Sequence, residues 1–391
     1  MTSNKSTRRN WAATRAGLAA LAAGAALAPL AAHAQGTPPT SSVSIYGLLD
    51  VGVEYIDKVG AGAGHLTRMP SNTGTLPSRL GFRGSEDLGG GLRAVFTLEM
   101  GIAPDQGTLG QGGRGFGRQS YVGLAGPWGS VMLGRQYSML FWAVQDSDVI
   151  GPAVYAIGSL DAYIPNSRAD NALAYRGSFG AFSVGAQYSL GRDTVNAGPS
   201  PVGTNCAGES STDKSACRQW SLMAKYDTPL WGAVLSYDTQ HGRTPASSTD
   251  LIFNNLNSSD KTDQRLLLGA YVQVSDVKIG GGVLRRENDG DAVKPRSNLW
   301  YLGASYPLSS QLTLTGQVST LRYSDVSDYN SSLIAARLLY SLSKRTAIYA
   351  QYGHIRNQRL AAVSVSGGAA GSNPAAGASQ NGVNLGVRHA F

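Results

Sequence analysis

Alternation of apolar and polar positions is the dominant pattern of this 391-residue chain. Between Val43 and Tyr55 the odd-numbered positions are almost all apolar, whereas Ser44, Asp50 and Glu54 lie between them. Residues 381–391 repeat the pattern, and the chain stops on an aromatic residue. A period of two places the apolar side chains on one face of an extended strand and the polar ones on the other. Both stretches are therefore predicted to be long amphipathic β-strands.

Similar segments fill the chain between these two strands, and most of them come in pairs joined by a tight turn. The predicted hairpins pair 79–87 with 92–102, 119–125 with 130–136, 173–176 with 182–190, 220–226 with 233–239, 265–274 with 277–286, 299–306 with 312–322, and 333–342 with 347–354. With the first and last strands, the total is about sixteen.

The connections between the strands alternate in length. The short turns are 88–91, 126–129, 228–230, 275–276, 307–311 and 343–344, and the long loops are 58–77, 104–116, 137–170, 191–218, 243–263 and 359–380. This sorting is typical of an outer-membrane barrel with short periplasmic turns and long extracellular loops. The predicted fold class is all-β: a transmembrane antiparallel β-barrel of about sixteen strands, wide enough for a water-filled lumen. Residues 361–379 are low in complexity and uncharged, and are expected to form a flexible surface loop.

The first residues resemble an export signal. Four basic residues precede an uncharged Ala/Leu-rich run from Ala16 to Leu30, and Ala32-His33-Ala34 follows with the small-x-small cleavage pattern. The sequence thus predicts a signal peptide over 1–34 and a barrel over 35–391. A membrane anchor is the alternative, but the run is short and Pro29 interrupts it.

Removal of this signal reduces the positive charge. The whole chain has 33 Lys+Arg against 25 Asp+Glu, and the signal has four of the basic residues, so 29 against 25 remain, a net charge of +4. The remaining basic residues form no run, which argues against a nucleic-acid partner. Fifty glycines and 18 tyrosines fit many strands and tight turns. Mean hydropathy is −0.14, far below that of a bundle of membrane helices.

Cys206 and Cys217 are the two cysteines, in a Gly/Ser/Thr/Asp-rich stretch. In an exported protein this pair is expected to form a disulfide that pins a loop, and free thiols are the main alternative. Neighbouring residues do not complete a four-ligand metal set, so no metal or cofactor is predicted.

The sequence contains no enzyme motif. The four histidines after the signal are isolated from one another, and neither G-x-S-x-G nor H-E-x-x-H occurs. The segment Gly110–Gly117 is glycine-rich but lacks the lysine of a phosphate-binding loop. The chain is therefore not expected to be an enzyme.

Three motifs resemble the general diffusion porins of Gram-negative bacteria, in particular their β-proteobacterial branch. They are Ser78-Arg-Leu-Gly-Phe-Arg-Gly-Ser-Glu-Asp-Leu-Gly-Gly-Gly-Leu92, Arg118-Gln-Ser-Tyr-Val-Gly-Leu124 and Trp128-Gly-Ser-Val-Met-Leu-Gly-Arg-Gln136, followed at the end of the chain by Phe391. The resemblance implies a homotrimer of sixteen-stranded barrels in the outer membrane, in contact with its lipid and lipopolysaccharide. It also implies that the barrel-insertion machinery reads Phe391 as an assembly signal.

The resemblance further implies a third loop that folds into the lumen and forms a constriction, here about 137–167. Arg79, Arg135 and Arg168 match the basic wall of that constriction, whereas a further basic position of the family falls on Leu48. The loop carries Asp146, Asp148 and Asp161, but it lacks the family's acidic Pro-Glu-Phe-Gly motif. The expected constriction sets the arginines against these aspartates.

Strand parity supports part of this assignment. Arg79 and Arg83 share a face that excludes Leu80 and Phe82, so both arginines are predicted to point into water. Arg135 instead shares parity with the lipid-facing residues of its strand. Either a bulge near Gly134 turns it into the lumen, or it snorkels at the membrane interface.

The function predicted from these features is passive diffusion of small hydrophilic solutes and ions, with a weak preference for anions. Arginines and carboxylates across a narrow pore would create a transverse field that biases ion flux. Three alternatives remain open. They are a substrate-specific channel, a surface adhesin or receptor barrel that would not conduct, and a soluble secreted β-protein that would need no detergent.

Overall fold

The computed structural model describes residues 41–70, 74–192, 206–246, 256–368 and 370–391. The predicted signal peptide, 1–34, lies outside the described residues. The strands of the described part are β1 (Ser42–Val59), β2 (Gly64–Arg68), β3 (Arg79–Gly89), β4 (Leu92–Ala103), β5 (Thr108–Leu109), β6 (Gln119–Gly126), β7 (Gly129–Tyr137), β8 (Arg168–Phe179), β9 (Phe182–Gly191), β10 (Gln219–Asp227), β11 (Trp231–His241), β12 (Thr262–Val274), β13 (Val277–Asn288), β14 (Arg296–Pro307), β15 (Leu312–Tyr323), β16 (Ser331–Ser341), β17 (Thr346–Asn357) and β18 (Gln380–Ala390).

All of these strands except β2 and β5 form one closed antiparallel barrel, which confirms the prediction of sixteen strands. Closure depends on β1, which is long enough to pair with two neighbours. Its first part pairs with β3 from Ser42 to Leu48, and its second part pairs with β18 from Leu48 to Ile56. In a closed barrel the backbone N–H and C=O groups of each strand pair with those of its neighbours. Lipid requires this, because it offers no hydrogen-bond partners for unpaired groups. The helices of the described residues are short, and none is long and apolar enough to cross a bilayer.

Outward-facing side chains form the apolar surface that the alternation predicts. On β1 the side chains of Val43 and Ile45 are 68% and 65% exposed, and on β18 that of Leu385 is 56% exposed. In water such a surface would be a liability, whereas in a bilayer it is the lipid-facing belt.

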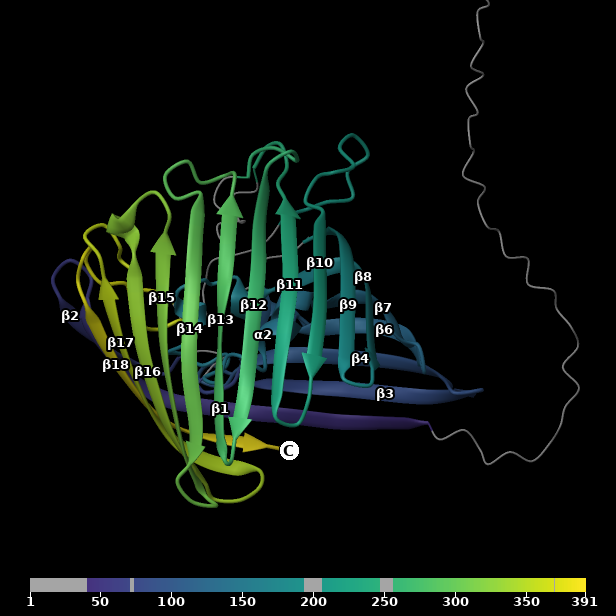
Figure 1. Ribbon diagram of the computed structural model, residues 1–391, viewed down its shortest axis with the longest axis horizontal. Helices are drawn as coiled ribbons and strands as arrows, with labels where there is room; N and C mark the ends of the chain where they lie inside the picture. The colour runs from purple at the N-terminus through teal and green to yellow at the C-terminus, as the bar shows by residue number, and fades with distance from the viewer. Residues whose placement is uncertain (1–40, 71–73, 193–205, 247–255, 369) are drawn as a thin grey trace, which may run out of the picture. The chain divides into compact units, whose positions relative to one another are not determined.

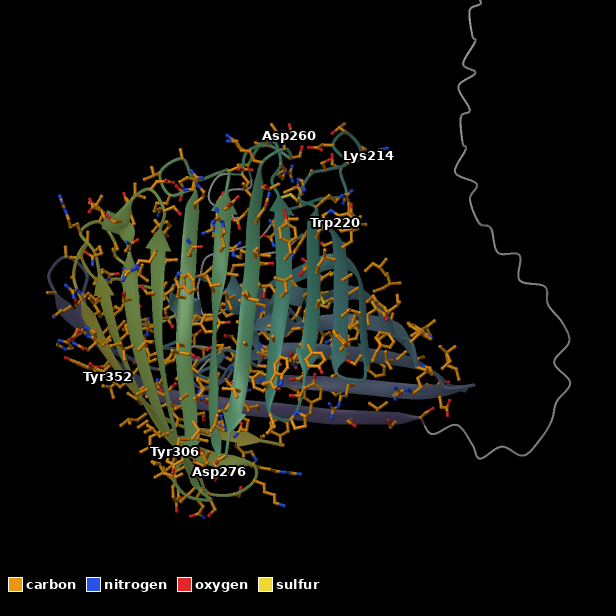
Figure 2. The ribbon with its side chains drawn as sticks, viewed as in Figure 1. Lys214, Trp220, Asp260, Asp276, Tyr306 and Tyr352 are labelled. Carbon is orange, nitrogen blue, oxygen red and sulfur yellow. A yellow bond between two sulfur atoms is a disulfide. The ribbon has the colours of Figure 1, made fainter. Side chains whose placement is uncertain are left out.

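Short turns and long loops lie at opposite edges of the strands (Figure 1). Figure 2 shows Asp276, in the turn between β12 and β13, at the lower edge beside Tyr306, and Lys214 and Asp260 in long connections at the upper edge. Trp220 lies near the upper ends of the strands (Figure 2). Outward-facing aromatic residues near both edges are typical of the girdles that mark the two membrane interfaces.

The inner face of six neighbouring strands, β12 to β17, is unexpectedly apolar. Each strand contributes one buried inward residue to a ladder: Leu267, Leu284, Leu299, Leu321, Leu333 and Ile355. The first four are directly paired across the strands, and so are the last two. The segment between β7 and β8 covers this ladder and contributes Leu140, Val144, Val154 and Ile157 to the same core.

The prediction of a flexible surface loop over 361–379 is wrong. In the structure Val365 is fully buried in the apolar core formed by the ladder and the segment between β7 and β8. Ser366 and Ser372 are also buried. The Gly367 amide donates to the Val154 carbonyl at 2.8 Å, so this loop packs directly on the segment between β7 and β8. Small Ala, Gly and Ser residues allow close approach of two backbones, a role that composition alone does not distinguish from solvent exposure.

Candidate functional site

The segment 138–167, here called the inner loop, joins β7 to β8 and is fastened at both of its ends. The Ser138 amide donates to the Ser167 carbonyl at 2.8 Å, which closes the base of the loop. Its first turn is α2 (Met139–Val144), whose Met139 amide donates to the Ser221 hydroxyl on β10 at 2.7 Å. Near its far end, the Tyr163 hydroxyl donates to Asp238 on β11 at 3.1 Å. These bonds and the apolar ladder hold the inner loop against the wall of β10 to β17.

The three aspartates of the inner loop all face this same wall. Asp146 accepts from Lys225 on β10 at 2.5 Å, Asp148 accepts from the Gln317 amide on β15 at 2.9 Å, and Asp161 accepts from Arg265 on β12 at 2.8 Å. The sequence-based expectation set them against the arginines of the opposite wall, and the structure corrects this pairing. The physical reason is burial: Asp148 and Asp161 are only 7% and 9% exposed, so each needs a partner on the surface that covers it.

Burial and hydrogen-bond partners shift the pKa values of Asp148 and Asp161 in opposite directions. Desolvation raises the pKa of Asp148 to about 6, because the hydrogen bonds from Gln317 and the backbone and the charge of Arg337 offset it only in part. Desolvation also acts on Asp161, but Arg265 and Arg286 outweigh it and hold the pKa of Asp161 below its usual value. Asp161 is thus ionised at neutral pH in a buried ion pair, whereas the pKa of Asp148 lies in the mildly acidic range.

Across the barrel, β3 carries arginines on its inward face as strand parity predicts. Arg83 is exposed, and its guanidinium lies 5.3 Å from the ring centroid of Tyr46 on β1. Arg79 lies 3.7 Å from the Glu99 carboxylate on β4, and Glu99 also accepts from the Tyr46 hydroxyl at 2.9 Å. Both arginines therefore stand on a polar inner surface.

Arg168 belongs to a stack of charged and aromatic groups beside this surface. Its guanidinium lies 4.5 Å from the ring centroid of Tyr137 and donates to the Tyr137 hydroxyl at 2.9 Å. Arg118 donates to the same hydroxyl at 2.6 Å and to Glu99 at 2.8 Å. Sequence reasoning missed Arg118 and Glu99. Arg118 is the first residue of one of the recognised motifs, and Glu99 has inward parity on β4, so both signals were available.

The bulge expected near Gly134 is present. Pairing between β7 and β8 shifts register between Gly134 and Gln136, and Gly134 has φ of 128°. The bulge leaves Arg135 only 7% exposed, with a guanidinium that donates to Asp170 at 2.7 Å and to the Gly117 carbonyl at 2.7 Å. Arg135 is thus an ion-paired residue within the wall.

On the periplasmic side of the inner loop, further cations line a cavity of about 570 Å³. The Arg176 guanidinium of β8 lies 4.2 Å from a ring centroid of Trp142 on α2. Lys225 contacts Asp146 and, at 2.9 Å, Asp227. This cavity thus has two cations and the carboxylate of Asp146 in its lining.

The remaining predicted residues lie away from the lumen. Cys206 and Cys217 are joined by a disulfide, with Cα atoms 5.5 Å apart, in the connection between β9 and β10. Phe391 exchanges two backbone hydrogen bonds with Gly47 on β1, each of 3.1 Å. Its ring lies so close to Gly47 that an added Cβ there would be 2.2 Å from it and 2.9 Å from the Arg79 carbonyl, so a larger residue would displace the ring.

A closed barrel with a lipid-facing exterior, a polar inner wall and one loop folded against the opposite wall defines an outer-membrane channel. Comparisons with known proteins agree. Residues 17–360 match the family model described as Gram-negative porin. The chain is 30% identical over 370 residues to outer membrane porin protein 32 of Delftia acidovorans, covering 90% of this chain and 94% of the relative.

Two further comparisons support this relationship. An outer membrane porin protein of Bordetella pertussis is 28% identical over 366 residues, covering 85% of this chain and 93% of the relative. The structure of an anion-selective porin from Comamonas acidovorans superimposes with a TM-score of 0.72 and 26% identity, covering 90% of this chain and all of that one. The chain belongs to the Gram-negative porin family. It is a passive diffusion channel of the outer membrane, not an enzyme.

Proposed function

We propose that this porin is weakly anion-selective and that the inner loop 138–167 forms its constriction. The observation that carries the proposal is the asymmetry of charge across the lumen. Arg79 and Arg83 stand on the open polar wall, whereas the aspartates of the loop are bound to the other wall. The loop carboxylates therefore do little to offset the arginines where ions pass. The anion-selective porin of Comamonas acidovorans, 26% identical, supports the same direction.

The physical basis is the field inside a narrow aqueous pore. Its low-dielectric wall focuses field lines, so a few fixed cations raise the local concentration of anions. Mobile salt screens this field, with a Debye length of about 30 Å at 0.01 M and about 3 Å at 1 M. The preference for anions is accordingly expected to be largest in dilute salt.

Reversal potentials across a planar bilayer with a salt gradient test this proposal. The double substitution Arg79→Gln/Arg83→Gln is expected to move the reversal potential toward cations, and more strongly in dilute salt. Arg322→Gln is the matched control, because Arg322 is exposed on β15 at a position of outward parity and contacts Ser332. An unchanged reversal potential in the double variant would remove these two residues from the selectivity mechanism and leave the channel function intact.

We further propose that the protein is exported by a cleaved signal peptide over 1–34 and assembles as a homotrimer. The outer-membrane setting supports contact with lipopolysaccharide and dependence on the barrel-insertion machinery. Phe391 is the proposed assembly signal, and its backbone pairing with Gly47 supports a role at the barrel seam. Phe391→Ala is expected to lower the amount of protein in the outer membrane far more than a substitution in an exposed loop. Equal amounts, with equal trimer content on unboiled gels, would exclude this role.

A further inference from the structure

At the extracellular end of the lumen, a cavity of about 380 Å³ is lined by parts of the inner loop and of the loop before β18, beside their direct contact. We propose that this cavity is a binding site for small amphiphilic carboxylates, which would load the mouth of the channel with solutes of this class. A volume of a few hundred cubic ångströms suits one small organic molecule. The inference goes beyond passive diffusion, because it adds a site at which a solute dwells before it crosses.

One end of the cavity holds a cation in an aromatic setting. The Lys294 ammonium lies 4.9 Å from the ring centroid of Tyr329 and 5.7 Å from that of Tyr323. Its carboxylate neighbour, Asp291, is 4.0 Å away, at the outer limit of an ion pair. Within the described residues, no hydrogen bond engages the phenol oxygen of either tyrosine. An ammonium and two phenol hydroxyls at one end of a cavity are suited to receive a carboxylate.

The other walls are built from the two loops and combine small apolar residues with serines. Leu360, Ala361, Ala362 and Val363 line one side, and Ala162 of the inner loop lies on the other. Lys294 is the one charged residue among the described residues that line the cavity, and Asn373 is the one amide. Four serines also line the cavity (Ser159, Ser364, Ser366 and Ser372), but their hydroxyl groups already take part in hydrogen bonds within the two loops. The ammonium is therefore the distinctive polar partner, and a carboxylate with an aromatic or aliphatic body would match both ends.

The barrel contains a matched control at its opposite edge. Lys278, next to the short turn between β12 and β13, lies 4.5 Å from the ring centroid of Tyr271. This pair has the same chemistry as Lys294 and Tyr329, but it is not part of the cavity. Substitution of either lysine removes one positive charge from the barrel, but only substitution of Lys294 removes it from the cavity. Comparison of the two variants therefore distinguishes loss of the site from a change in overall charge.

Single-channel recording with sodium benzoate added from the extracellular side tests the proposal. Benzoate is expected to interrupt the current with a dwell time that benzamide, its neutral counterpart, does not produce. Lys294→Gln should weaken benzoate binding about five-fold, the effect expected from one partly exposed charge contact. Lys278→Gln should leave it unchanged, and open-channel conductance in KCl should be normal in both variants.

A second variant tests the apolar end of the site. Ala362→Phe places a ring in the cavity and should abolish the benzoate interruptions while the channel still conducts. Equal interruption of wild type and Lys294→Gln, equal interruption by benzamide, or equal interruption from the periplasmic side would each overturn the site. Loss of conductance in the wild type would instead contradict the channel function.

Discussion

The inner walls of the two sides of this barrel are built from the same strand alternation, but only one of them carries a ladder of apolar residues. On β3, β4 and the segments around them, inward positions carry Arg79, Arg83 and Glu99. On β12 to β17 the corresponding positions include the ladder of leucines and an isoleucine. The first surface exposes Arg83 and, in part, Arg79, while Glu99 beside them is buried. The second is covered by the inner loop, which packs its own apolar residues against it.

This difference shows what the inward face of a porin strand encodes. A polar inward residue needs only water, but an apolar one facing an aqueous lumen is stabilised when another segment buries it. The ladder of β12 to β17 therefore selects the wall on which the inner loop lies. The arginine-bearing wall is not covered by the inner loop, and on our proposal the pore takes its charge from that side.

The largest effect is expected from a substitution that weakens the apolar wall. Leu299→Ala removes a fully buried side chain beneath the inner loop, and such substitutions in a packed interior cost about 2–5 kcal/mol. Because the loop is the element that can yield, we expect it to detach part of the time. Single-channel recordings should then show larger and noisier conductance, and larger solutes should enter faster in liposome-swelling assays.

Leu302→Ala is the matched control for this experiment. Leu302 lies on the same strand, β14, but it is 58% exposed on the lipid-facing side. Its truncation should leave conductance unchanged. If Leu299→Ala also had wild-type conductance and noise, the ladder would not be what holds the inner loop in place.

The next effect tests whether Asp161 anchors the inner loop or contributes charge to the pore. Asp161→Asn removes the carboxylate that pairs with Arg265, which is fully buried and retains Asp263 as a second partner. Loss of one partner of a buried pair is destabilising. We expect increased current noise with little change in reversal potential. A marked rise in anion preference at unchanged noise would instead mean that Asp161 contributes charge to the pore.

The strands and the sorting of turns and loops could be predicted from sequence, because a period of two is a local signal that each strand carries by itself. The same alternation assigned Arg79 and Arg83 to the inner face, and glycine within β7 indicated the bulge. The partners of the loop aspartates could not be predicted. Arg265 and Gln317 lie 104 and 169 residues from Asp161 and Asp148, and their contacts form only when the barrel closes. The inward packing of Val365 was missed because its Ala/Gly/Ser-rich surroundings resemble a solvent-exposed loop.

A smaller effect depends on pH. Desolvation raises the pKa of Asp148 from 3.8 to about 6, so the folded state holds this proton more tightly than the unfolded chain. The contribution of Asp148 to the free energy of unfolding is therefore fully present below about pH 4 and is lost as the pH rises through 6. The loss is about 3 kcal/mol at most. Asp148→Asn should therefore flatten this part of the pH dependence and raise stability near pH 7.5 relative to wild type.

The temperature at which the folded barrel loses its fast mobility on gels measures this effect at pH 4 and pH 7.5. Asp146→Asn is the control, since Asp146 is partly exposed and bonded to Lys225. The relevant quantity is the difference between variant and wild type, because other carboxyl groups titrate in both. If the transition temperatures of Asp148→Asn and wild type differed by the same amount at pH 4 and at pH 7.5, Asp148 would not be the group that takes up the proton.

The smallest effect is expected outside the lumen, where the chain is held by a covalent bond instead of by packing. The disulfide closes a loop with a sequence separation of 11 residues, and in the chain-entropy model a loop of this size is stabilised by about 3 kcal/mol. That free energy acts on the connection between β9 and β10, which does not belong to the inner loop. Cys206→Ser/Cys217→Ser should thus increase proteolysis of this connection while conductance and reversal potential stay within error. A change in conductance or reversal potential when the wild-type disulfide is reduced would instead mean that the connection between β9 and β10 is mechanically coupled to the constriction.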